Sequence, residues 1–490
     1  MSDTNLIHKK LSKLFFDVFG NYPTGIESLV AHGSLRTYFR VFGKETSVIG
    51  TYNINIEENE AFFAFAKHFG KLGLPVPEIL AVSEKKTCYL QTDLGDTTLF
   101  HLVQESLKKD TFDEAVIDRY KECLLRLVEF QVIGNRKLDY SIAYPTPNFG
   151  KKAIFDDLTY FKYFFLKLHP EISYNESKLY EDFEKLTDFL CEAPANFFMY
   201  RDFQSRNIMI HNDKCYFIDF QSGRQGPLQY DLISILYQVK AQMPQVVRDE
   251  LYHYYLKCLS KHLDVSELKF ETYFSAFVFL RLMQVLGAYG FRGIVQRKTH
   301  FLTSIPYAIQ EIDRQLTLLN IPLSLPELKG IFQQLSFLKT KYTLPNDKET
   351  AKFQIEINSF SYFKTGIPED KSGHGGGFVF DCRALPNPGK YPEYRLLTGL
   401  DKKVIQFLEK EKSVHEFSIN TQKLIAQSVE NYLERGFKHL MVNFGCTGGQ
   451  HRSVYFAEKT TAWIKATYPD IEVVCKHLVI NSDEQKHCTT

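Results

Sequence analysis

The stretches YRDFQSRN (residues 200–207) and IDFQ (residues 218–221) decide the fold of the larger part of this chain. Apolar residues flank both stretches and a polar turn separates them, so the pattern predicts a short strand, a loop and a β-hairpin. Such a hairpin would bring the side chains of Asp202, Asn207 and Asp219 to one place.

These three side chains are typical of phosphoryl transfer, which depends on positioning and charge neutralisation. Asp202 could orient an attacking hydroxyl group and accept its proton. Asn207 and Asp219 offer the hard oxygen ligands that Mg²⁺ prefers, with phosphate and water completing the octahedron. The alternative is that both aspartates are ordinary turn residues. Their combined spacing between apolar strands favours the catalytic interpretation.

The surrounding pattern predicts an α+β, kinase-like domain of two lobes over residues 1–338. A hairpin over residues 34–53, a helix over residues 57–72 and a strand over residues 88–92 predict a small β-rich lobe. Helical patterns dominate from there to about residue 196 and return after residue 231. They predict a larger helical lobe that carries the hairpin.

The stretch over residues 339–352 is polar and lacks periodicity, so it is predicted to be a linker. In residues 353–490, segments with a strand pattern alternate with segments with a helix pattern, which predicts a compact α/β domain. The expected strands cover residues 353–362, 377–382, 438–444 and 471–478, and the expected helices cover residues 401–411, 421–435 and 451–467.

The composition is that of a soluble protein with two or three domains. The chain has 490 residues, 44% hydrophobic and 24% charged, and its formal charge is +1. Nothing global indicates nucleic-acid or membrane partners. The first twenty residues predict an amphipathic helix, and the apolar stretch 274–291 contains Arg281 and Gln284, so a buried helix is expected there.

The nine cysteines lack paired spacing. They predict reduced thiols in a cytoplasmic protein, without a visible zinc framework.

A second motif, GCTGGQHRS (residues 445–453), follows an apolar segment and opens a predicted helix. Glycine-rich backbone at a helix N-terminus predicts a phosphate cradle. Arg452 could add a bidentate contact, and the position would stabilise a thiolate on Cys446. The Cys-x5-Arg-Ser spacing is also that of cysteine-dependent phosphatases, but a noncatalytic pocket is favoured. A glycine-rich turn around a buried cysteine is the remaining alternative.

Residues 8–335 resemble the aminoglycoside phosphotransferase and choline kinase superfamily. Within it they are most similar to bacterial kinases that phosphorylate N-acetylmuramate or N-acetylglucosamine at the anomeric hydroxyl. The resemblance is carried by GSLRTYFR (residues 33–40), by residues 200–207 and by residues 218–232. It implies ATP and Mg²⁺ as cofactors and a sugar as substrate.

This resemblance also assigns roles to individual residues. Asp202 would be the catalytic base, Asn207 and Asp219 would bind Mg²⁺, and Asp231 would be a structural anchor. The 33–40 turn would cover the ATP phosphates, and residues 91–94 would lie beside the adenine. The residues expected to contact the nucleotide are Gly33, Ser34, Arg36, Arg40 and Asp93.

Two departures from that superfamily matter. Tyr200 stands where a histidine is usual, and residues 47–51 contain no lysine for the α- and β-phosphates. Glu60 would be the glutamate that pairs with such a lysine, and Arg40 or Lys44 could substitute for the missing partner.

Residues 353–478 resemble the C-terminal domain of bacterial RNase adaptor proteins that sense glucosamine-6-phosphate. The resemblance is carried by FDCR (380–383), LPNP (385–388), LTGLD (397–401) and residues 445–455. It implies a sugar-phosphate pocket near Asp381, Arg383, Cys446, Thr447, Gly448, His451 and Arg452.

Other features separate the chain from those adaptors. It has no Walker-type motif, it has Gly389 where the family often has histidine, and its tail over residues 481–487 is mixed in charge where the family's tail is basic. RNA binding is therefore only weakly expected.

Three hypotheses follow. The first is an ATP-dependent kinase for an amino sugar, with a second domain that binds a sugar-phosphate effector. The second is a regulatory protein that senses glucosamine-6-phosphate through that domain and keeps a degraded kinase fold. The third is a bifunctional kinase and phosphatase, with Cys446 as nucleophile and Asp381 as acid. The sequence does not identify the sugar or the oligomeric state.

Overall fold

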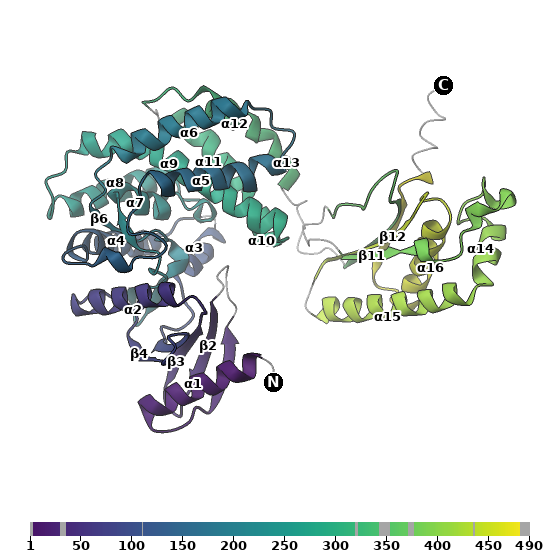
Figure 1. Ribbon diagram of the computed structural model, residues 1–490, viewed down its shortest axis with the longest axis horizontal. Helices are drawn as coiled ribbons and strands as arrows, with labels where there is room; N and C mark the ends of the chain where they lie inside the picture. The colour runs from purple at the N-terminus through teal and green to yellow at the C-terminus, as the bar shows by residue number, and fades with distance from the viewer. Residues whose placement is uncertain are drawn as a thin grey trace. The chain divides into compact units, whose positions relative to one another are not determined.

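The computed structural model describes residues 3–29, 36–109, 111–318, 322–342, 353–370, 377–434 and 437–480. The chain divides into two compact units (Figure 1). Unit 1 comprises Met1–Arg292 with Ser304–Lys341, and unit 2 comprises Gly293–Thr303 with Tyr342–Thr490. A bilobal α+β unit and a compact α/β unit confirm the predicted fold class. The predicted domain boundaries stay predictions, and residues 343–352 of the expected linker lie outside the described residues.

The small lobe of unit 1 is one antiparallel sheet in the order β1-β2-β3-β5-β4. The predicted hairpin is confirmed as the β2–β3 pair. The sequence pattern did not reveal β1 or β4, because β1 contains no fully buried residue and β4 has only four residues. The strands are β1 (Gly25–Leu29), β2 (Thr37–Phe42), β3 (Ser47–Tyr52), β4 (Ile79–Val82) and β5 (Cys88–Thr92).

Helix α1 (Asp3–Phe19) packs Leu11 and Phe15 onto this sheet. A Cβ atom at Gly50 would lie 2.9 Å from Leu11, so glycine at this position of β3 allows the close approach. Helix α2 (Ile56–Lys71) begins at Asn55, whose side chain accepts from the Glu58 amide at 3.1 Å. Its buried aromatic residues point toward the larger lobe, where the site lies.

The larger lobe is helical and carries two small antiparallel hairpins. Strand β6 (Phe197–Met199) pairs with β9 (Arg224–Gly226), and β7 (Ile208–His211) pairs with β8 (Lys214–Phe217). Residues 339–342 are helical where a linker was expected. The α-helices are α3 (Leu99–Leu107), α4 (Glu114–Val128), α5 (Lys151–Phe164), α6 (Glu176–Cys191), α7 (Leu228–Leu236), α8 (Gln245–Leu259), α9 (Glu267–Tyr289), α11 (Ile305–Leu318), α12 (Pro326–Gln334) and α13 (Leu338–Tyr342); α10 (Thr299–Leu302) is grouped with unit 2.

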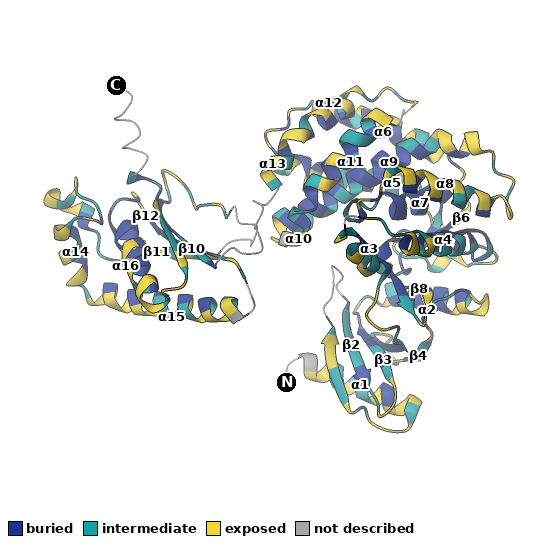
Figure 2. Cartoon of the chain, turned by 180° about the vertical axis from the view of Figure 1, so that it is seen from behind, coloured by how far each residue is buried: buried dark blue, intermediate teal, exposed yellow. Residues whose placement is uncertain are grey.

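The long apolar helix α9 is a core element of the larger lobe (Figure 2). The segment Glu267–Val295 is long and apolar enough to cross a membrane, but 72% of its apolar window is buried inside the protein. Arg281 is buried as well, and its guanidinium contacts the hydroxyl of Tyr230 at 3.2 Å. These contacts agree with the buried helix expected from the sequence.

Unit 2 contains a four-stranded parallel sheet in the order β11-β12-β10-β13. The four expected strands are confirmed, whereas α15 begins at Lys412, nine residues before the predicted helix. The elements are β10 (Gln354–Ser361), β11 (Gly377–Asp381), β12 (His439–Cys446), β13 (Glu472–His477), α14 (Lys402–Glu409), α15 (Lys412–Glu434) and α16 (Arg452–Thr467).

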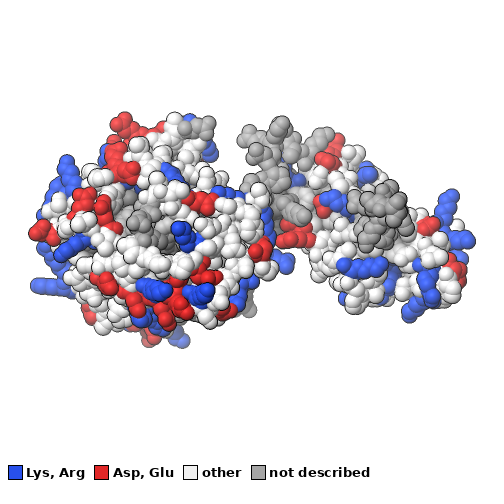
Figure 3. Space-filling model, turned by 90° about the horizontal axis from the view of Figure 1, so that it is seen from above, with Lys and Arg blue, Asp and Glu red and all other residues white. Residues whose placement is uncertain are grey.

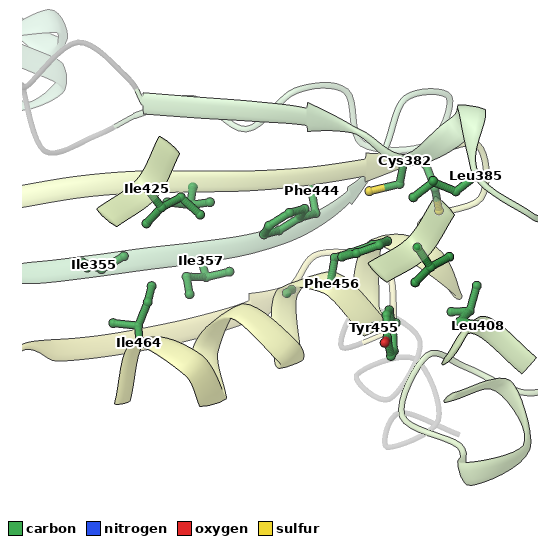
Figure 4. Close-up of a cluster of buried hydrophobic side chains, with 14 of the residues drawn as sticks. Ile355, Ile357, Cys382, Leu385, Leu408, Ile425, Phe444, Tyr455, Phe456 and Ile464 are labelled. Carbon is green, nitrogen blue, oxygen red and sulfur yellow. The ribbon is translucent and has the colours of Figure 1, made fainter. Parts of the chain in front are cut away.

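The core of unit 2 lies between this sheet and its helices (Figure 4). Phe444 of β12 stacks on Phe456 of α16, with ring centroids 5.9 Å apart. Because all four strands are parallel, their carboxyl ends meet at one edge of the sheet. Ser361 there pairs with Cys446, and Ser359 with His477.

Charged side chains of both signs are interspersed on the face shown in Figure 3. This distribution over the described residues of that face agrees with the near-zero formal charge of the whole chain.

Candidate phosphotransfer site and anion-binding loop

Asn207 joins the two aspartates of the predicted site. Its side-chain amide donates to the backbone carbonyl of Asp202 at 2.9 Å and to Oδ2 of Asp219 at 3.3 Å. Its own carbonyl accepts from the Ile218 amide at 3.0 Å. The structure therefore brings together the three residues that the spacing predicted. All three are only partly buried, so the site is open to solvent.

The donor set at this point fits a hard divalent cation. Burial, followed by the negative charge of Asp202, raises the pKa of Asp219 above its usual value. Gln221 donates to Oδ1 of Asp219 at 2.6 Å and fixes the carboxylate. The NH₂ group of Asn207 is bound to protein, so Oδ1 is the side-chain atom that could bind a metal ion. A carboxylate and an amide oxygen beside a second carboxylate are suitable Mg²⁺ ligands.

The backbone around these residues adopts unfavourable conformations, and side chains from two neighbouring helices hold it in place. Arg201 and Asp219 both adopt left-handed conformations, with φ of 76° and 69°. Such conformations cost roughly 1–3 kcal/mol each in a non-glycine residue. Buried Asp231 of α7 accepts the amides of Tyr200 and Arg201 at 2.6 and 2.9 Å. The guanidinium of Arg201 also binds Asp157 at 2.7 Å. The loop that contains Asp202 is thus anchored to α5 and α7.

Tyr200 has a structural role that accounts for its departure from the superfamily pattern. Its hydroxyl donates to the carbonyl of Ile218 at 2.6 Å, directly before Asp219. The ring packs edge-on against Phe203 and Phe220. The tyrosine therefore ties the loop that contains Asp202 to the turn that contains Asp219.

Arg36 is a buried cation that pairs with a carboxylate of α2 and lies near Asp219. Its guanidinium is 3.6 Å from the carboxylate of Glu58 on α2, and only 2% of its side chain is exposed. Burial opposes its charge, but Tyr89, Tyr38, Glu58 and Asp219 raise its pKa above the ordinary value.

Sequence reasoning identified Arg36 but not its partner Glu58. The expected Glu60 instead pairs with Lys86 on an exposed surface. The sequence did contain a signal for the correct position, because Glu58 follows the Asn55 helix cap by three residues, but the tertiary contact could not be read from it.

Arg40 and Asp93, both expected at the nucleotide, form a closed ion-pair cluster. Arg40 binds Asp93 at 2.8 Å and Asp96 at 2.9 Å. Burial opposes ionisation of Asp93, but hydrogen bonds from Ser47 and Arg40 lower its pKa. These contacts favour structural roles, and contact with the nucleotide stays a prediction. Gly33 and Ser34 lie outside the described residues.

In unit 2 the loop after β12 turns around the sulfur of Cys446. The Gly449 amide donates to Sγ at 3.2 Å, and Oγ of Ser453 also lies 3.2 Å from it. Gly449 has φ of 68°, and a Cβ there would lie 2.5 Å from Val479, so both conformation and space require glycine. Thr447 and Gly448 are exposed on the turn.

The other predicted pocket residues lie at the same edge, but their contacts differ from the expected ones. Arg452 is 4% exposed, and its Nη1 donates to the carbonyls of Arg383 and Leu385 at 2.9 and 2.8 Å. His451 likewise contacts the carbonyl of Tyr394 at 2.8 Å. Both side chains therefore hold the adjacent loop through its backbone, which differs from the bidentate phosphate contact proposed for Arg452.

Asp381 and Arg383 form an ion pair at 2.7 Å beside that loop. The hydrogen bond from Arg383 lowers the pKa of Asp381. A carboxyl group with a lowered pKa is a poor proton donor at neutral pH, which weakens the phosphatase hypothesis.

Comparisons with known proteins place both parts of the chain in families. Residues 28–263 match the model of the phosphotransferase enzyme family. Residues 353–481 match the model of the RapZ C-terminal domain. The chain therefore joins a region of the phosphotransferase enzyme family to a region of the RapZ C-terminal type, which confirms both resemblances at the level of these two families.

Curated relatives match the second domain. The RNase adapter protein RapZ of Yersinia pseudotuberculosis is 41% identical over 125 residues, which cover 26% of this chain and 42% of that protein. A nucleotide-binding protein of Petrotoga mobilis is 41% identical over 127 residues, with coverages of 26% and 42%. The matched region thus spans about two fifths of these relatives' length.

Solved structures resemble the first unit. A choline/ethanolamine kinase family protein from Mesorhizobium loti has a TM-score of 0.42 at 15% identity, covering 68% of this chain and 99% of that chain. An amicoumacin kinase, solved with AMP-PNP and Ca²⁺, has a TM-score of 0.42 at 12% identity, covering 70% and 98%.

Proposed function

We propose that unit 1 transfers the γ-phosphoryl group of ATP to the anomeric hydroxyl of an amino sugar. The observation that carries this proposal is the Asn207 amide, which links the Asp202 backbone to the Asp219 carboxylate. Asp202 orients the sugar hydroxyl and takes its proton. Asn207 and Asp219 would hold Mg²⁺, which neutralises phosphate charge when bound. The choice of an amino sugar rests on the sequence resemblance of unit 1.

Arg36 completes the nucleotide end of this proposed site. Its guanidinium presents several donors in a fixed plane, which suits phosphate oxygens. Glu58 keeps that plane in place, much as a glutamate supports the lysine of other kinases. Arg40 is less suited to this role, because the carboxylates of Asp93 and Asp96 already accept from its donors.

The test of the kinase proposal is ATP consumption with N-acetylmuramate, N-acetylglucosamine and choline. We expect turnover with an amino sugar and a loss of about 10²-fold or more in kcat for Asp202→Asn. Asp213→Asn is the matched control, since Asp213 lies on the exposed turn of the same hairpin and binds Arg119. Equal activity of Asp202→Asn and the control, or no turnover with any acceptor, contradicts the proposal.

For unit 2 we propose a sugar-phosphate effector, bound at the turn formed by Thr447 and Gly448. Exposed backbone at the start of the 16-residue helix α16 supports this assignment. Nothing lies within 4 Å of a Cβ built at Gly448, so alanine fits there. In calorimetry with glucosamine-6-phosphate we expect Gly448→Asp to weaken binding at least tenfold by charge repulsion, and Gly448→Ala to keep it.

The same calorimetry separates the kinase from the regulatory alternative. Binding of Mg-ATP together with the sugar phosphate supports the enzyme. Binding of the sugar phosphate without Mg-ATP supports a sensor whose kinase fold is degraded. The Arg36–Glu58 pair and the Tyr200 bridge favour the enzyme, because they supply an ordered cation and an ordered loop in a domain that lacks the usual lysine and histidine.

A further inference from the structure

Three side chains able to bind a metal ion meet between α16 and β13, apart from the two sites described above. They are Glu458 of α16 and Cys475 and His477 of β13, and one ligand atom of each lies within 4.8 Å of the other two. Because side chains alternate along a strand, Cys475 and His477 point to the same face of β13. That face packs against the core that contains α16.

The separations of the ligand atoms suit a tetrahedral ion. Nε2 of His477 lies 3.0 Å from Oε1 of Glu458, and Sγ of Cys475 lies 3.5 Å from the same oxygen. Zinc bonds of about 2.0–2.3 Å to such ligands place them roughly 3.4–3.6 Å apart. Side-chain shifts of a few tenths of an ångström are therefore sufficient for these two pairs.

A supporting contact orients the histidine. Nδ1 of His477 is 2.9 Å from Oγ of Ser359, a fully buried residue on β10. This contact holds Nε2 toward the cluster, and such outer contacts are usual for metal-bound histidine. His477 is 8% exposed, whereas the Glu458 side chain is 46% exposed. The cluster is thus fixed on its inner side and open to an ion and a water molecule on its outer side.

We propose that Glu458, Cys475 and His477 bind Zn²⁺ and fasten the end of β13 to α16. Val479 lies two residues after the end of β13 and packs against Gly449. The ion would therefore also stabilise the position of the loop around Cys446. The sequence showed no zinc framework, because two ligands are separated by one residue and the third is on a preceding helix.

The competing explanation is a hydrogen-bonded trio without a metal. Burial raises the pKa of Cys475 to about 11, so the metal-free cysteine is a neutral thiol at pH 7. Metal binding requires the thiolate and releases its proton. The two states therefore differ in a spectroscopic property, which is the sulfur-to-metal charge-transfer band of a cobalt-substituted protein.

The experiment titrates the full-length protein with Co²⁺ after dialysis against a chelator, and then adds Zn²⁺. We expect a near-ultraviolet thiolate band at one equivalent of Co²⁺ that Zn²⁺ removes. Cys475→Ser should abolish the band, and Cys191→Ser, which changes an exposed cysteine of α6, should retain it. Ser359→Ala should weaken the affinity by about 10–100-fold.

Glu458→Gln is a second variant that is expected to fold, because this half-exposed side chain can be changed without disturbing the core. It keeps the proposal testable if Cys475→Ser does not fold. We expect it to keep the thiolate band and to weaken Co²⁺ affinity more than tenfold. Circular dichroism checks that each variant is folded. Absence of a thiolate band in the wild-type protein, or an unchanged band in folded Cys475→Ser, overturns the proposal.

Discussion

The Asp202 loop of unit 1 and the Cys446 loop of unit 2 both carry an arginine beside a reactive side chain, and they use it differently. Arg201 lies beside Asp202 and binds the carboxylate of Asp157, which supports the loop and leaves Asp202 partly exposed. Arg452 is the first residue of α16, directly after the Cys446 loop, and donates to backbone carbonyls. The comparison teaches that motif spacing predicts which residues lie close together. The hydrogen-bond partners of each arginine then decide whether it can bind a ligand or only supports the loop.

The largest effect should come from the oxygen ligands of unit 1. Asp219→Asn removes the negative carboxylate that we propose as a ligand of Mg²⁺. We therefore expect kcat to fall about 10³-fold, with a higher Mg²⁺ requirement. Steady-state kinetics over a range of Mg²⁺ concentrations measures both. Gln221→Met leaves the Asp219 carboxylate in place and removes only the amide that binds it, without adding charge, and should have a much smaller effect. Comparable losses in the two variants would show that the turn's shape matters more than its metal ligand.

The second prediction separates Arg36 from Arg40. We expect Arg36→Ala to lower kcat/KM for ATP about 10²-fold, because a buried guanidinium beside Asp219 is lost. Arg40→Ala should change kcat/KM less than threefold. It should instead lower stability by about 1–2 kcal/mol, since Asp93 and Asp96 lose their partner. The opposite ranking in ATP kinetics would restore Arg40 as the phosphate ligand.

The third prediction concerns Arg452 and the Cys446 loop of unit 2. Removing a donor that serves two backbone carbonyls, of which the contact to Leu385 is buried, should cost about 2–3 kcal/mol of stability in Arg452→Ala. Chemical denaturation with a probe in unit 2 measures this loss. Gln450→Ala, which removes a partly exposed donor to the Leu397 carbonyl, is the control and should cost less. If Arg452→Ala keeps full stability and loses only sugar-phosphate binding, Arg452 acts as the phosphate ligand after all.

Much of the fold followed from local patterns. The strands of unit 2 are apolar runs bounded by turn residues, and Asn55 and Gly73 mark the ends of α2. Strand β1 escaped prediction because its exposed residues do not alternate, and its pairing with β2 exists only in the tertiary structure.

The candidate sites show the same limit. Asp202, Asn207 and Asp219 were identified because a short hairpin fixes their separation. Glu58, Ser359 and Glu458 were missed, since each meets its partner through the packing of elements that are distant in sequence. The sequence also could not show that Arg40 binds two carboxylates, because Asp93 and Asp96 are more than fifty residues away.

The smallest effect concerns the pH dependence of the cluster around Asp93. Hydrogen bonds from Ser47 and Arg40 depress its pKa, so its stabilising contribution is present above the unfolded value near 4 and is lost as the pH falls through the folded value. Asp93→Asn should therefore be less stable than the wild type at pH 7, and the difference in stability should shrink as the pH falls through the lowered pKa of Asp93. Asp96→Asn, at the exposed end of the cluster, should show a weaker dependence. A stability difference that does not change with pH over the acid range would mean that Asp93 acts through its shape and hydrogen bonds, not through its charge.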